Sequence, residues 1–540
     1  MLGQMQTQSL LISSILTHAA RHHGAAEIVS REASGALHRT NYAALERRAR
    51  RLARALQALG VQPGDRVATL AWNGHRHVEA YYAVPGMGSV VHTVNPRLSP
   101  DDIAHILGDA GSVVLLAEAG FAGLVAGIAP RLPQLRAVVS LAEDGARPDL
   151  PLAPGQVLLD YETLLADASD DFAWPELDER AASTLCYTSG TTGRPKGVLY
   201  SHRSQVLHAY AINLPDVLGL RAMDRVLPVV PMFHVNAWGL PHAAPLVGAA
   251  LLLPGRQLDG ANLADLMNRE RATFSAGVPT VWLGLLQHLR ATGTRLDTVK
   301  RLVCGGSACP PMLIEAFGEY GVEVVHAWGM TETSPLGSCY APKQGAGDPE
   351  RLRLKQGRSI AGIDMRITDD AGREVPWDGA QFGNLEVRGH WVNRRYYGFA
   401  EDATTGDGWF PTGDVATIDP HGFMEITDRT KDVVKSGGEW ISSIQLENIA
   451  VEHPDVAEAA VIAAKHPKWD ERPLLIVVPK PGRAVEPATI LALFEGRVAK
   501  WWLPDEVVVV EDLPHTATGK INKLALRQRF AGHRLPTAAE

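Results

Sequence analysis

One loop constrains the fold of this 540-residue chain more than any other segment. Residues 187–197 read YTSGTTGRPKG, which combines four serine or threonine hydroxyls, three glycines and two cations. The glycines and Pro195 keep the segment out of a helix, and successive N–H groups in such a loop can bind phosphate oxygens. Lys196 adds a cation that suits a phosphate tail. The segment therefore indicates a loop that holds a nucleotide triphosphate.

The spacing of this loop differs from that of the Walker-type phosphate loop. That motif places four residues between its first glycine and a Gly-Lys-Ser/Thr triplet. Here Gly193 is followed by Arg194, Pro195 and Lys196, and no serine or threonine follows the lysine. The alternative interpretation is a flexible Gly/Thr surface turn, so partner motifs elsewhere in the chain must decide.

Composition indicates an ordinary soluble globular protein. Its length exceeds a single hydrophobic core, so two or more domains are expected. A net charge of −8 argues against nucleic acid as a partner. Four scattered cysteines fit buried thiols in a reducing cytosol rather than disulfides or a paired zinc site. The sequence has neither a basic leader nor an apolar run of about 20 residues, so no transmembrane segment is expected and the predicted location is cytoplasmic.

Apolar periodicity predicts an N-terminal α/β domain with a largely parallel sheet. Residues 42–59 have helical spacing, and residues 67–70 and 112–116 read as short buried strands with a helical pattern at 77–86 between them. Short alternating runs from about residue 360 to 426 predict a small barrel or a twisted sheet.

A charged run at residues 428–432 predicts a domain boundary, because it interrupts two strand-like segments. The tail that follows predicts an α+β module with a helix at 443–451, strands at 457–463 and 474–478, a helix at 487–499 and a strand at 506–510. A small module behind a charged linker is free to move. The predicted domains are therefore residues 1–428, a hinge at 429–432 and a mobile domain at 433–540.

The segment PMFHVNAW at residues 231–238 follows a strand-like run. A lone histidine is more often a core or surface residue than a ligand. His234, however, stands at a predicted strand end, where α/β proteins bind ligands, and Trp238 lies four residues later.

Two glycine-containing segments follow. Gly305-Gly306-Ser307 is a turn or a place where the backbone must pass close to a ligand. In HAWGMTET, residues 326–333, Glu332 is the single carboxylate. It is either a ligand for a hard cation or part of a Thr/Glu pair that caps a following helix.

Three weaker signals lie near the C-terminus. Asp414 follows Thr412-Gly413, as in a turn. The glycine pair in VKSGGEWIS, residues 434–442, predicts a hairpin. Lys520 lies in the Gly/Thr-rich segment PHTATGKI, residues 514–521, where a lysine is usually solvated.

Taken in order, these segments resemble the motifs of the adenylate-forming superfamily, which contains acyl-CoA synthetases, peptide-synthetase adenylation domains and luciferases. The resemblance runs from about Leu10 to Phe530, and it is closest to bacterial medium- and long-chain fatty acyl-CoA ligases and to ligases for 3-methylmercaptopropionate. It implies a large N-terminal domain of α/β sheets with a small β-barrel-like region, and a small, mobile α+β C-terminal domain.

The resemblance also implies ATP, Mg²⁺ and CoA as ligands and assigns residues to them. Catalytic roles fall to Lys520, His234, Glu332 and Thr331. Contacts with ATP or AMP fall to Thr188, Ser189, Gly190, Thr191, Thr192, Gly193, Lys196, Gly305, Gly306, Ser307, His326, Ala327, Trp328, Gly329, Met330, Thr331, Asp414, Arg429 and Lys520. The acyl pocket would comprise His234, Trp238, Gly305, Gly306, Trp328 and Pro335. The CoA step and the hinge would use Lys431, Lys435, Gly437, Gly438, Glu439 and Trp440. Glu332 and Thr188 would hold the metal.

The implied activity is that of an ATP-dependent acid–thiol ligase, acting as a homodimer on a small-molecule acid, ATP and CoA. It would form an acyl-adenylate, release pyrophosphate, and pass the acyl group to CoA with release of AMP. The acid is a medium- or long-chain fatty acid or a similar apolar acid, with 3-methylmercaptopropionate as the specific alternative.

Two competing functions stay open at the level of the sequence. One is an enzyme that passes the adenylate to a carrier arm or to oxygen, and the second is a catalytically silent nucleotide-binding protein. Loss of Lys520 or Glu332 would have favoured the silent protein, and both residues are present.

Overall fold

The computed structural model describes residues 1, 3–143, 145, 148–188, 194–437, 439–515 and 521–539. The chain forms two compact units. The first unit consists of Met1–Thr188, Pro195–Asp364 and Arg388–Gly408, and the second consists mainly of Met365–Val387 and Trp409–Glu540. The boundary predicted at Asp428 lies within the second unit, and the hinge there stays a prediction.

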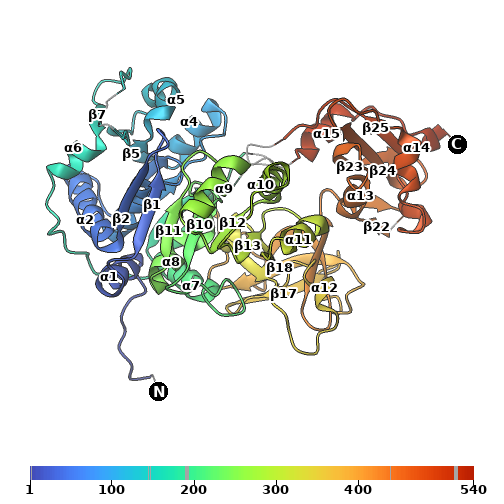
Figure 1. Cartoon of the computed structure of the whole chain (residues 1–540), viewed down its shortest axis with the longest axis horizontal. Coiled ribbons are helices and arrows are strands. Elements are labelled where there is room, and N and C mark those ends of the chain that lie inside the picture. Colours follow the sequence, from blue (N-terminus) through green and yellow to red (C-terminus); the bar gives the residue numbers. More distant parts are fainter. Residues whose placement is uncertain are drawn as a thin grey trace. The chain divides into compact units, whose positions relative to one another are not determined.

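A nine-stranded sheet forms one layer of the first unit (Figure 1). Its central strands are parallel and its ends are antiparallel. In spatial order the strands are β16 (Arg358–Ser359), β15 (Leu336–Cys339), β14 (Glu323–Gly329), β13 (Arg301–Cys304), β12 (Phe274–Gly277), β10 (Arg225–Pro228), β11 (Ala250–Leu253), β1 (Glu27–Arg31) and β2 (Leu37–Asn41). The carboxyl ends of parallel β10, β13 and β14 share one edge. The segments of His234, Gly305 and Thr331 therefore begin at that edge.

Three helices cover this sheet through apolar contacts (Figure 1). They are α9 (Gly260–Arg269), α10 (Pro279–Thr292) and α11 (Pro311–Gly318). Leu263, Trp282 and Phe317, one from each helix, are almost fully buried against the strands. Their burial fixes the sheet that carries the predicted substrate motifs.

A seven-stranded sheet forms the second layer of the first unit, and it is parallel except where β9 joins β8. In spatial order the strands are β7 (Val157–Asp160), β6 (Ala137–Ser140), β5 (Ser112–Ala117), β3 (Arg66–Leu70), β4 (Val90–Thr93), β8 (Ala182–Tyr187) and β9 (Gly197–Ser201). The predicted strands at 67–70 and 112–116 are confirmed. Helices α4 (Pro100–Asp109) and α5 (Ala122–Ile128) pack on this sheet, whose strands β8 and β9 flank the predicted phosphate loop.

The first unit contains further helices, most of which pack on one another or on strands of the two sheets. They are α1 (Ile12–His22), α2 (Tyr42–Ala58), α3 (His75–Gly86), α7 (His202–Ile212) and α8 (Leu240–Val247); the shorter helices are α6 (Tyr161–Ala166) and α12 (Pro349–Leu352). Helix α2 begins where Asn41 Oδ1 accepts a 2.9 Å hydrogen bond from Ala44 N, as an N-cap does. The helices predicted at 42–59 and 77–86 are confirmed. None of the described helices combines the length and the apolar character needed to cross a bilayer.

The four cysteines are all buried and free of disulfides, as predicted. Cys304 ends strand β13, and Cys339 ends strand β15. Burial raises the pKa of the Cys339 thiol to about 12, which keeps it protonated and unreactive.

The second unit contains a four-stranded sheet, the counterpart of the short strands predicted between residues 360 and 426. Its order is β17 (Ile363–Thr368), β18 (Gly383–Gly389), β19 (Phe410–Ile418) and β20 (Met424–Arg429). Strand β19 pairs antiparallel with both β18 and β20. This pairing brings Asp414 of β19 opposite Arg429 of β20.

The C-terminal part of the second unit is α+β, as predicted. Its sheet consists of β22 (Glu439–Ile441), β21 (Val434–Ser436), β24 (Asp470–Pro479), β23 (Val456–His466) and β25 (Glu506–Val509), and its helices are α13 (Ser443–Ala450), α14 (Pro487–Ala492) and α15 (Lys523–Arg529). The consecutive residues Val461 and Ile462 of β23 point to opposite faces of the sheet and belong to different apolar clusters. Both faces of the sheet are therefore covered. The helix predicted at 487–499 is shorter in the structure, where α14 ends at Ala492. Turns follow it, and Gly496 adopts a φ of 71°, which no α-helix continues through.

Candidate active site

The base of the predicted phosphate loop is held by the two residues that flank it. Thr188 N donates a 2.9 Å hydrogen bond to the Lys196 carbonyl, and Lys196 N donates to Thr188 Oγ1 at 3.1 Å. This pairing continues the antiparallel ladder of β8 and β9. The predicted phosphate contacts Ser189, Gly190, Thr191, Thr192 and Gly193 lie outside the described residues.

A cation, an aromatic ring and a buried carboxylate follow one another beside this loop. Lys196 Nζ lies 4.8 Å from the centroid of the Tyr396 ring, a distance typical of a cation–π contact. The Tyr396 hydroxyl donates a 2.8 Å hydrogen bond to Glu332 Oε1. Burial raises the pKa of Tyr396, and the negative charge of the Glu332 carboxylate raises it further. The Tyr396 hydroxyl therefore stays protonated and can donate. The arrangement links the predicted phosphate loop to the predicted metal ligand.

The backbone that carries Glu332 is fixed from two sides. Thr331–Thr333 forms one short turn between β14 and β15. Asn393 N donates a 2.7 Å hydrogen bond to the Glu332 carbonyl, and the Tyr200 hydroxyl donates a 2.6 Å bond to the Thr331 carbonyl. In the alternative interpretation Thr331 and Glu332 begin a capped helix; the structure has them at the start of a single 3-10 turn, which leads directly into strand β15.

The segment after His234 has an unusual backbone. Val235, Asn236, Ala237, Trp238 and Gly239 have φ angles of 44°, 52°, 48°, 55° and 76°, a run in the left-handed region. Each non-glycine residue in this region costs about 1–2 kcal/mol. Such strain is concentrated at functional sites, where the surrounding structure holds it in place. The partly buried His234 thus precedes a turn that the fold imposes against local preference.

The left-handed turn places the Trp238 indole against the predicted glycine wall. A Cβ atom built on Gly305 would lie 3.2 Å from this indole, and one built on Gly306 would lie 3.8 Å from it. A side chain at Gly305 would therefore crowd the ring. The structure brings Trp238, Gly305 and Gly306 together, while Ser307 is exposed. That these three residues line an acyl pocket stays a prediction.

Residues 326–330 form the end of β14 and the turn after it. The His326 imidazole is committed to the protein, because its Nδ1 lies 2.9 Å from the Leu354 carbonyl and its Nε2 accepts from Cys309 N at 3.3 Å. Burial lowers the pKa of His326 to about 4, so the ring is neutral. A nucleotide contact at His326 would therefore use its backbone.

The remaining residues of this segment are placed by the strand and the following turn. Ala327, Trp328 and Gly329 belong to β14, and Trp328 packs against Gly337. Met330 N donates a 3.1 Å bond to the carbonyl of Pro335, which is buried.

In the second unit, the two predicted ribose contacts form an ion pair. Arg429 Nε lies 2.6 Å from Asp414 Oδ1. Asp414 is almost fully buried, whereas the Arg429 side chain is 43% exposed. The guanidinium therefore orients the Asp414 carboxylate while keeping access to solvent.

The predicted hairpin of the second unit is confirmed. Strands β21 and β22 pair Lys435 with Trp440, and Lys435 Nζ lies 4.9 Å from the centroid of the indole. Gly437 has a φ of 59°, which suits the turn. Gly438 lies outside the described residues, Glu439 is described only as part of β22, and Lys431 is exposed near the end of β20.

The predicted catalytic lysine, Lys520, also lies outside the described residues. The described chain resumes at Ile521, two residues before helix α15 begins. The positions of Lys520 and of the rest of segment 516–520 stay predictions.

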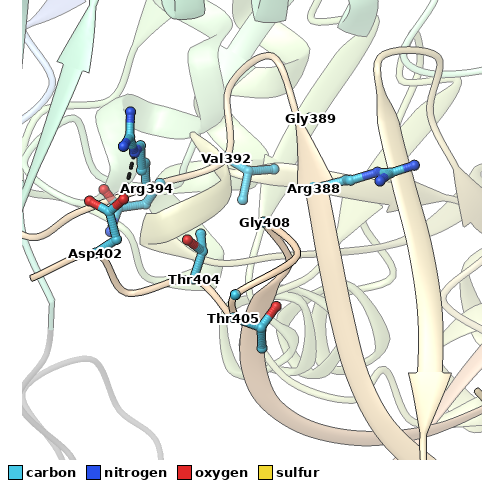
Figure 2. Close-up of a pocket in the computed structure, with 10 residues that line it drawn as sticks. Arg388, Gly389, Val392, Arg394, Asp402, Thr404, Thr405 and Gly408 are labelled. Atoms are coloured by element: carbon cyan, nitrogen blue, oxygen red, sulfur yellow. Dashed lines mark hydrogen bonds and ion pairs between the residues drawn. The ribbon is translucent and has the colours of Figure 1, made fainter. Parts of the chain in front are cut away.

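A pocket of about 530 Å³ opens beside the segment that carries Tyr396. Figure 2 shows Arg394 paired with Asp402 on one side of this pocket and Arg388 on the other. Arg394 Nε lies 2.7 Å from Asp402 Oδ2, so its guanidinium is already paired. Glycine backbone, Thr404 and Thr405 supply much of the remaining lining.

Three residues that shape the site were not predicted from the sequence. They are Tyr396, Asn393 and Tyr200, which hold the carboxylate of Glu332, the backbone of Glu332 and the backbone of Thr331, respectively. The only local signal was the Tyr396-Tyr397 pair before Gly398 in a polar segment. Nothing in that pattern identifies Glu332 as the partner.

Two protein-family models match the sequence. The model described as AMP-binding enzyme matches residues 16–397, and the model described as AMP-binding enzyme C-terminal domain matches residues 445–520. Together they account for both the first unit and the C-terminal module.

The chain is also similar to proteins of known activity over nearly its whole length. It is 51% identical over 536 residues to the 3-methylmercaptopropionyl-CoA ligase of Ruegeria lacuscaerulensis, covering 98% of this chain and 99% of the relative. It is 49% identical to the medium-chain-fatty-acid–CoA ligase of Ectopseudomonas oleovorans, covering 98% of each chain. Among solved structures, the anthranilate CoA ligase AuaEII in complex with anthranoyl-AMP matches with a TM-score of 0.85 and 25% identity, covering 97% of this chain and 98% of that one.

Proposed function

The chain belongs to the family of AMP-binding enzymes, and from this premise we propose that it is an ATP-dependent acid–thiol ligase. It activates a carboxylic acid to an acyl-adenylate with release of pyrophosphate, and then transfers the acyl group to CoA with release of AMP. The observation that carries this proposal is the end-to-end similarity to CoA ligases, at 51% identity over 98% of the chain. Two steps are needed because a carboxylate is ionised at neutral pH and cannot acylate a thiol directly.

We assign the first step to cations and donors around the nucleotide. One anion must attack the α-phosphate of another, so positive charge has to be in place before reaction. Lys520 and Lys196 would supply positive charge, and the hydroxyls of residues 188–192 would donate hydrogen bonds to the phosphates. Asp414 and Arg429 would bind the ribose, and His234 would flank the carboxylate of the acid.

The residues present fit Mg²⁺, the metal that this chemistry requires. Glu332 offers a buried carboxylate whose Oε1 already accepts from Tyr396, and Thr188 offers a hydroxyl at the base of the phosphate loop. Oxygen ligands of this kind suit Mg²⁺, which keeps several waters. Glu332 and Thr188 would hold the ion, and when bound it neutralises charge on the phosphates.

The second step requires Lys520 to withdraw and a path to open for the CoA thiol. A small domain that turns on residues 429–432 can meet both needs in sequence, which is gating rather than acceleration of the chemistry. Lys431 would sit at the pivot. The hairpin of the second unit would then face the path of the thiol. Its residues in this role would be Lys435, Gly437, Gly438, Glu439 and Trp440. The domains proposed are residues 1–428 and 433–540.

The substrate we propose is an apolar acid, with Trp238, Gly305, Gly306, Trp328 and Pro335 as pocket walls. The relatives include ligases named for 3-methylmercaptopropionate and for medium-chain fatty acids. One methylene in an apolar pocket is worth only about 1–3 kcal/mol, so chain-length preference should be graded. We further propose that the enzyme is cytoplasmic, as its cysteine usage suggests, and that it is a homodimer, as the sequence resemblance implies.

A product-release assay over a series of acids tests the proposed activity. CoA-dependent AMP release should be measured with acids from propionate to palmitate and with 3-methylmercaptopropionate, and at least one acid should support turnover. Acid-dependent pyrophosphate release with no CoA-dependent AMP release would indicate an enzyme that stops at the adenylate. No release with any acid would favour a silent nucleotide-binding protein.

The role of Lys520 has its own test. Lys520→Ala should abolish pyrophosphate release from acid and ATP, since removing one preorganised donor typically costs about 10²–10³ in rate. It should spare thioester formation from preformed acyl-adenylate. Equal loss of both half-reactions would remove Lys520 from this role.

A further inference from the structure

Helices α7 and α8 enclose a group of buried polar side chains that the proposed mechanism does not use. Among the described residues, seven nitrogen and oxygen atoms of this group have no hydrogen-bond partner: His202 Nε2, Gln205 Nε2 and Oε1, His208 Nδ1, Asn236 Nδ2, and His242 Nδ1 and Nε2. Each of these five residues is at most 1% exposed. We call these five residues the α7–α8 polar cluster.

The five residues come from three adjoining segments and gather in one place. His202, Gln205 and His208 recur at every third position of α7, Asn236 lies in the left-handed turn, and His242 lies in α8. Helices α7 and α8 are in direct contact. Burial is the main cause of the lowered pKa of His208 and of His242. His242 lowers the pKa of His208 further, and His202 lowers that of His242, so these rings lie near one another.

The cluster adjoins the predicted acyl pocket. A Cβ atom built on Gly239, next to Trp238, would lie 2.7 Å from His208 Nδ1. His208 Nε2 accepts a 3.2 Å hydrogen bond from Leu336 N, the residue after the pocket wall Pro335. Trp238 and Pro335, two proposed walls of the acyl pocket, are therefore next in sequence to Gly239 and Leu336, which contact His208 of the cluster.

Buried polar atoms are almost always paired in native proteins. Seven unpaired atoms in one helix interface therefore require partners from outside the chain, either water or polar atoms of a ligand. Burial lowers the pKa of His208 to about 3 and that of His242 to about 4, so both rings are neutral at physiological pH. Neutral imidazoles and amides offer both donors and acceptors, which suits a hydroxyl better than a carboxylate or an ammonium group.

We propose that the α7–α8 polar cluster is the distal subsite of the acyl pocket and binds a neutral hydrogen-bonding group, such as a hydroxyl, at the far end of the acid's chain. This inference rests on the proposed ligase function. It narrows the substrate class from apolar acids in general to acids with an apolar chain and a polar terminus.

The test compares matched pairs of acids in CoA-dependent AMP release. Each pair has one unsubstituted acid and one ω-hydroxy acid of equal carbon number, from hexanoate to dodecanoate. Wild-type enzyme should have a higher kcat/KM for the hydroxy acid at one or more chain lengths. A lower value at every length overturns the proposal without any variant.

Two variants then locate the effect. Gln205→Met and His242→Leu should each reduce the ratio of kcat/KM for hydroxy over unsubstituted acid by about tenfold or more at the preferred length, because a buried partner is lost. The control is Val206→Ala, which alters packing on the same helix without changing polarity and should leave the ratio unchanged. The use of a ratio separates recognition from a general loss of folded enzyme.

The outcomes separate the subsite from the overall function. An active enzyme whose ratio is the same in wild type and in both variants shows that the cluster holds structural water, and only the subsite is then rejected. Absence of AMP release with every acid rejects the proposed ligase function and the subsite with it.

Discussion

The Tyr396 hydroxyl lies 2.8 Å from Glu332 Oε1, while the same ring lies 4.8 Å from Lys196 Nζ. One side chain thus contacts both the proposed metal ligand and the proposed phosphate cation. Tyr396 belongs to neither motif, yet it fixes the distance between them. Its hydroxyl and its ring make separable contributions.

Tyr396→Phe tests the hydroxyl alone, because the ring stays under Lys196. A hydrogen bond to a charged group is worth about 1.5–3 kcal/mol, so we expect the KM for Mg–ATP in pyrophosphate release to rise about tenfold or more. Transfer from preformed adenylate to CoA should change little. Tyr397→Phe is the matched control, because the hydroxyl of Tyr397 lies 3.4 Å from the Ala110 carbonyl and not at Glu332. Equal effects of the two substitutions would contradict the role of Tyr396.

Asp414→Asn tests the ion pair of the second unit. The amide keeps the shape of the carboxylate but loses the charge that holds Arg429 at 2.6 Å. Arg429 is 43% exposed and can rehydrate, so the thermal midpoint should fall little. The KM for ATP should rise about tenfold, since a charged acceptor for the ribose hydroxyls is lost. The exposed pair of Asp364 and Arg388 provides the control through Asp364→Asn, and a similar rise in KM there would contradict the assignment.

Apolar periodicity is a local property, so the sequence alone could locate the segments in which this periodicity is strong. The helix at 42–59 and the strands at 67–70 and 112–116 have this periodicity and are present. Helix α14 is shorter than predicted: it ends at Ala492, and Gly496 further along adopts a positive φ that a polar-apolar pattern does not reveal.

The site was less predictable because its contacts join distant segments. Tyr396 and Glu332 are 64 residues apart, and no pattern in either segment specifies the other. The left-handed run after His234 includes valine and tryptophan, which rarely adopt positive φ. Only the surrounding packing imposes it, so local propensity could not have predicted it.

Lys523→Met tests a buried charge cluster near the predicted hinge. Lys523 Nζ lies 2.6 Å from both Glu447 Oε1 and Ser443 Oγ, and Ser443 Oγ donates a 3.0 Å bond to Asp428 Oδ1. Removing the cation leaves the buried Glu447 without its counter-ion, although Val461 N still donates to its Oε1 at 2.7 Å. Breaking a buried ion pair in this way typically costs about 3–5 kcal/mol. We expect a clear fall in the thermal midpoint of the C-terminal module and slower pyrophosphate release, because α15 follows the Lys520 segment.

The control for this prediction lies on the same helix. Arg529 is 49% exposed and lies 4.0 Å from Asp512, so Arg529→Met should change the free energy of unfolding by less than about 1 kcal/mol. Calorimetry of both variants would measure the difference. Equal midpoints for the two variants would show that the Lys523 cluster does not stabilise the module.

His77→Gln tests the acid sensitivity of the first unit. His77 is 1% exposed, and its Nδ1 lies 2.9 Å from the Trp72 carbonyl. Because a carbonyl oxygen can only accept a hydrogen bond, Nδ1 carries the proton. Nε2 then accepts from Thr69 Oγ1 at 2.9 Å. Burial lowers the pKa of His77 from 6.5 to about 4, against the opposing effect of the Trp72 carbonyl. The folded state therefore binds the proton less tightly than the unfolded state does.

The sign of the pH dependence follows from this difference. The contribution of His77 to the free energy of unfolding is full above pH 6.5 and is lost as the pH falls towards 4, by about 3 kcal/mol in total. Glutamine does not titrate, so His77→Gln should lose less stability than wild type between pH 7 and pH 4.5, whatever its stability at pH 7. Urea midpoints at several pH values would measure this, with the exposed His105→Gln as control. A pH dependence for His77→Gln as steep as that of the His105 variant would mean that His77 already accepts a proton in the folded chain.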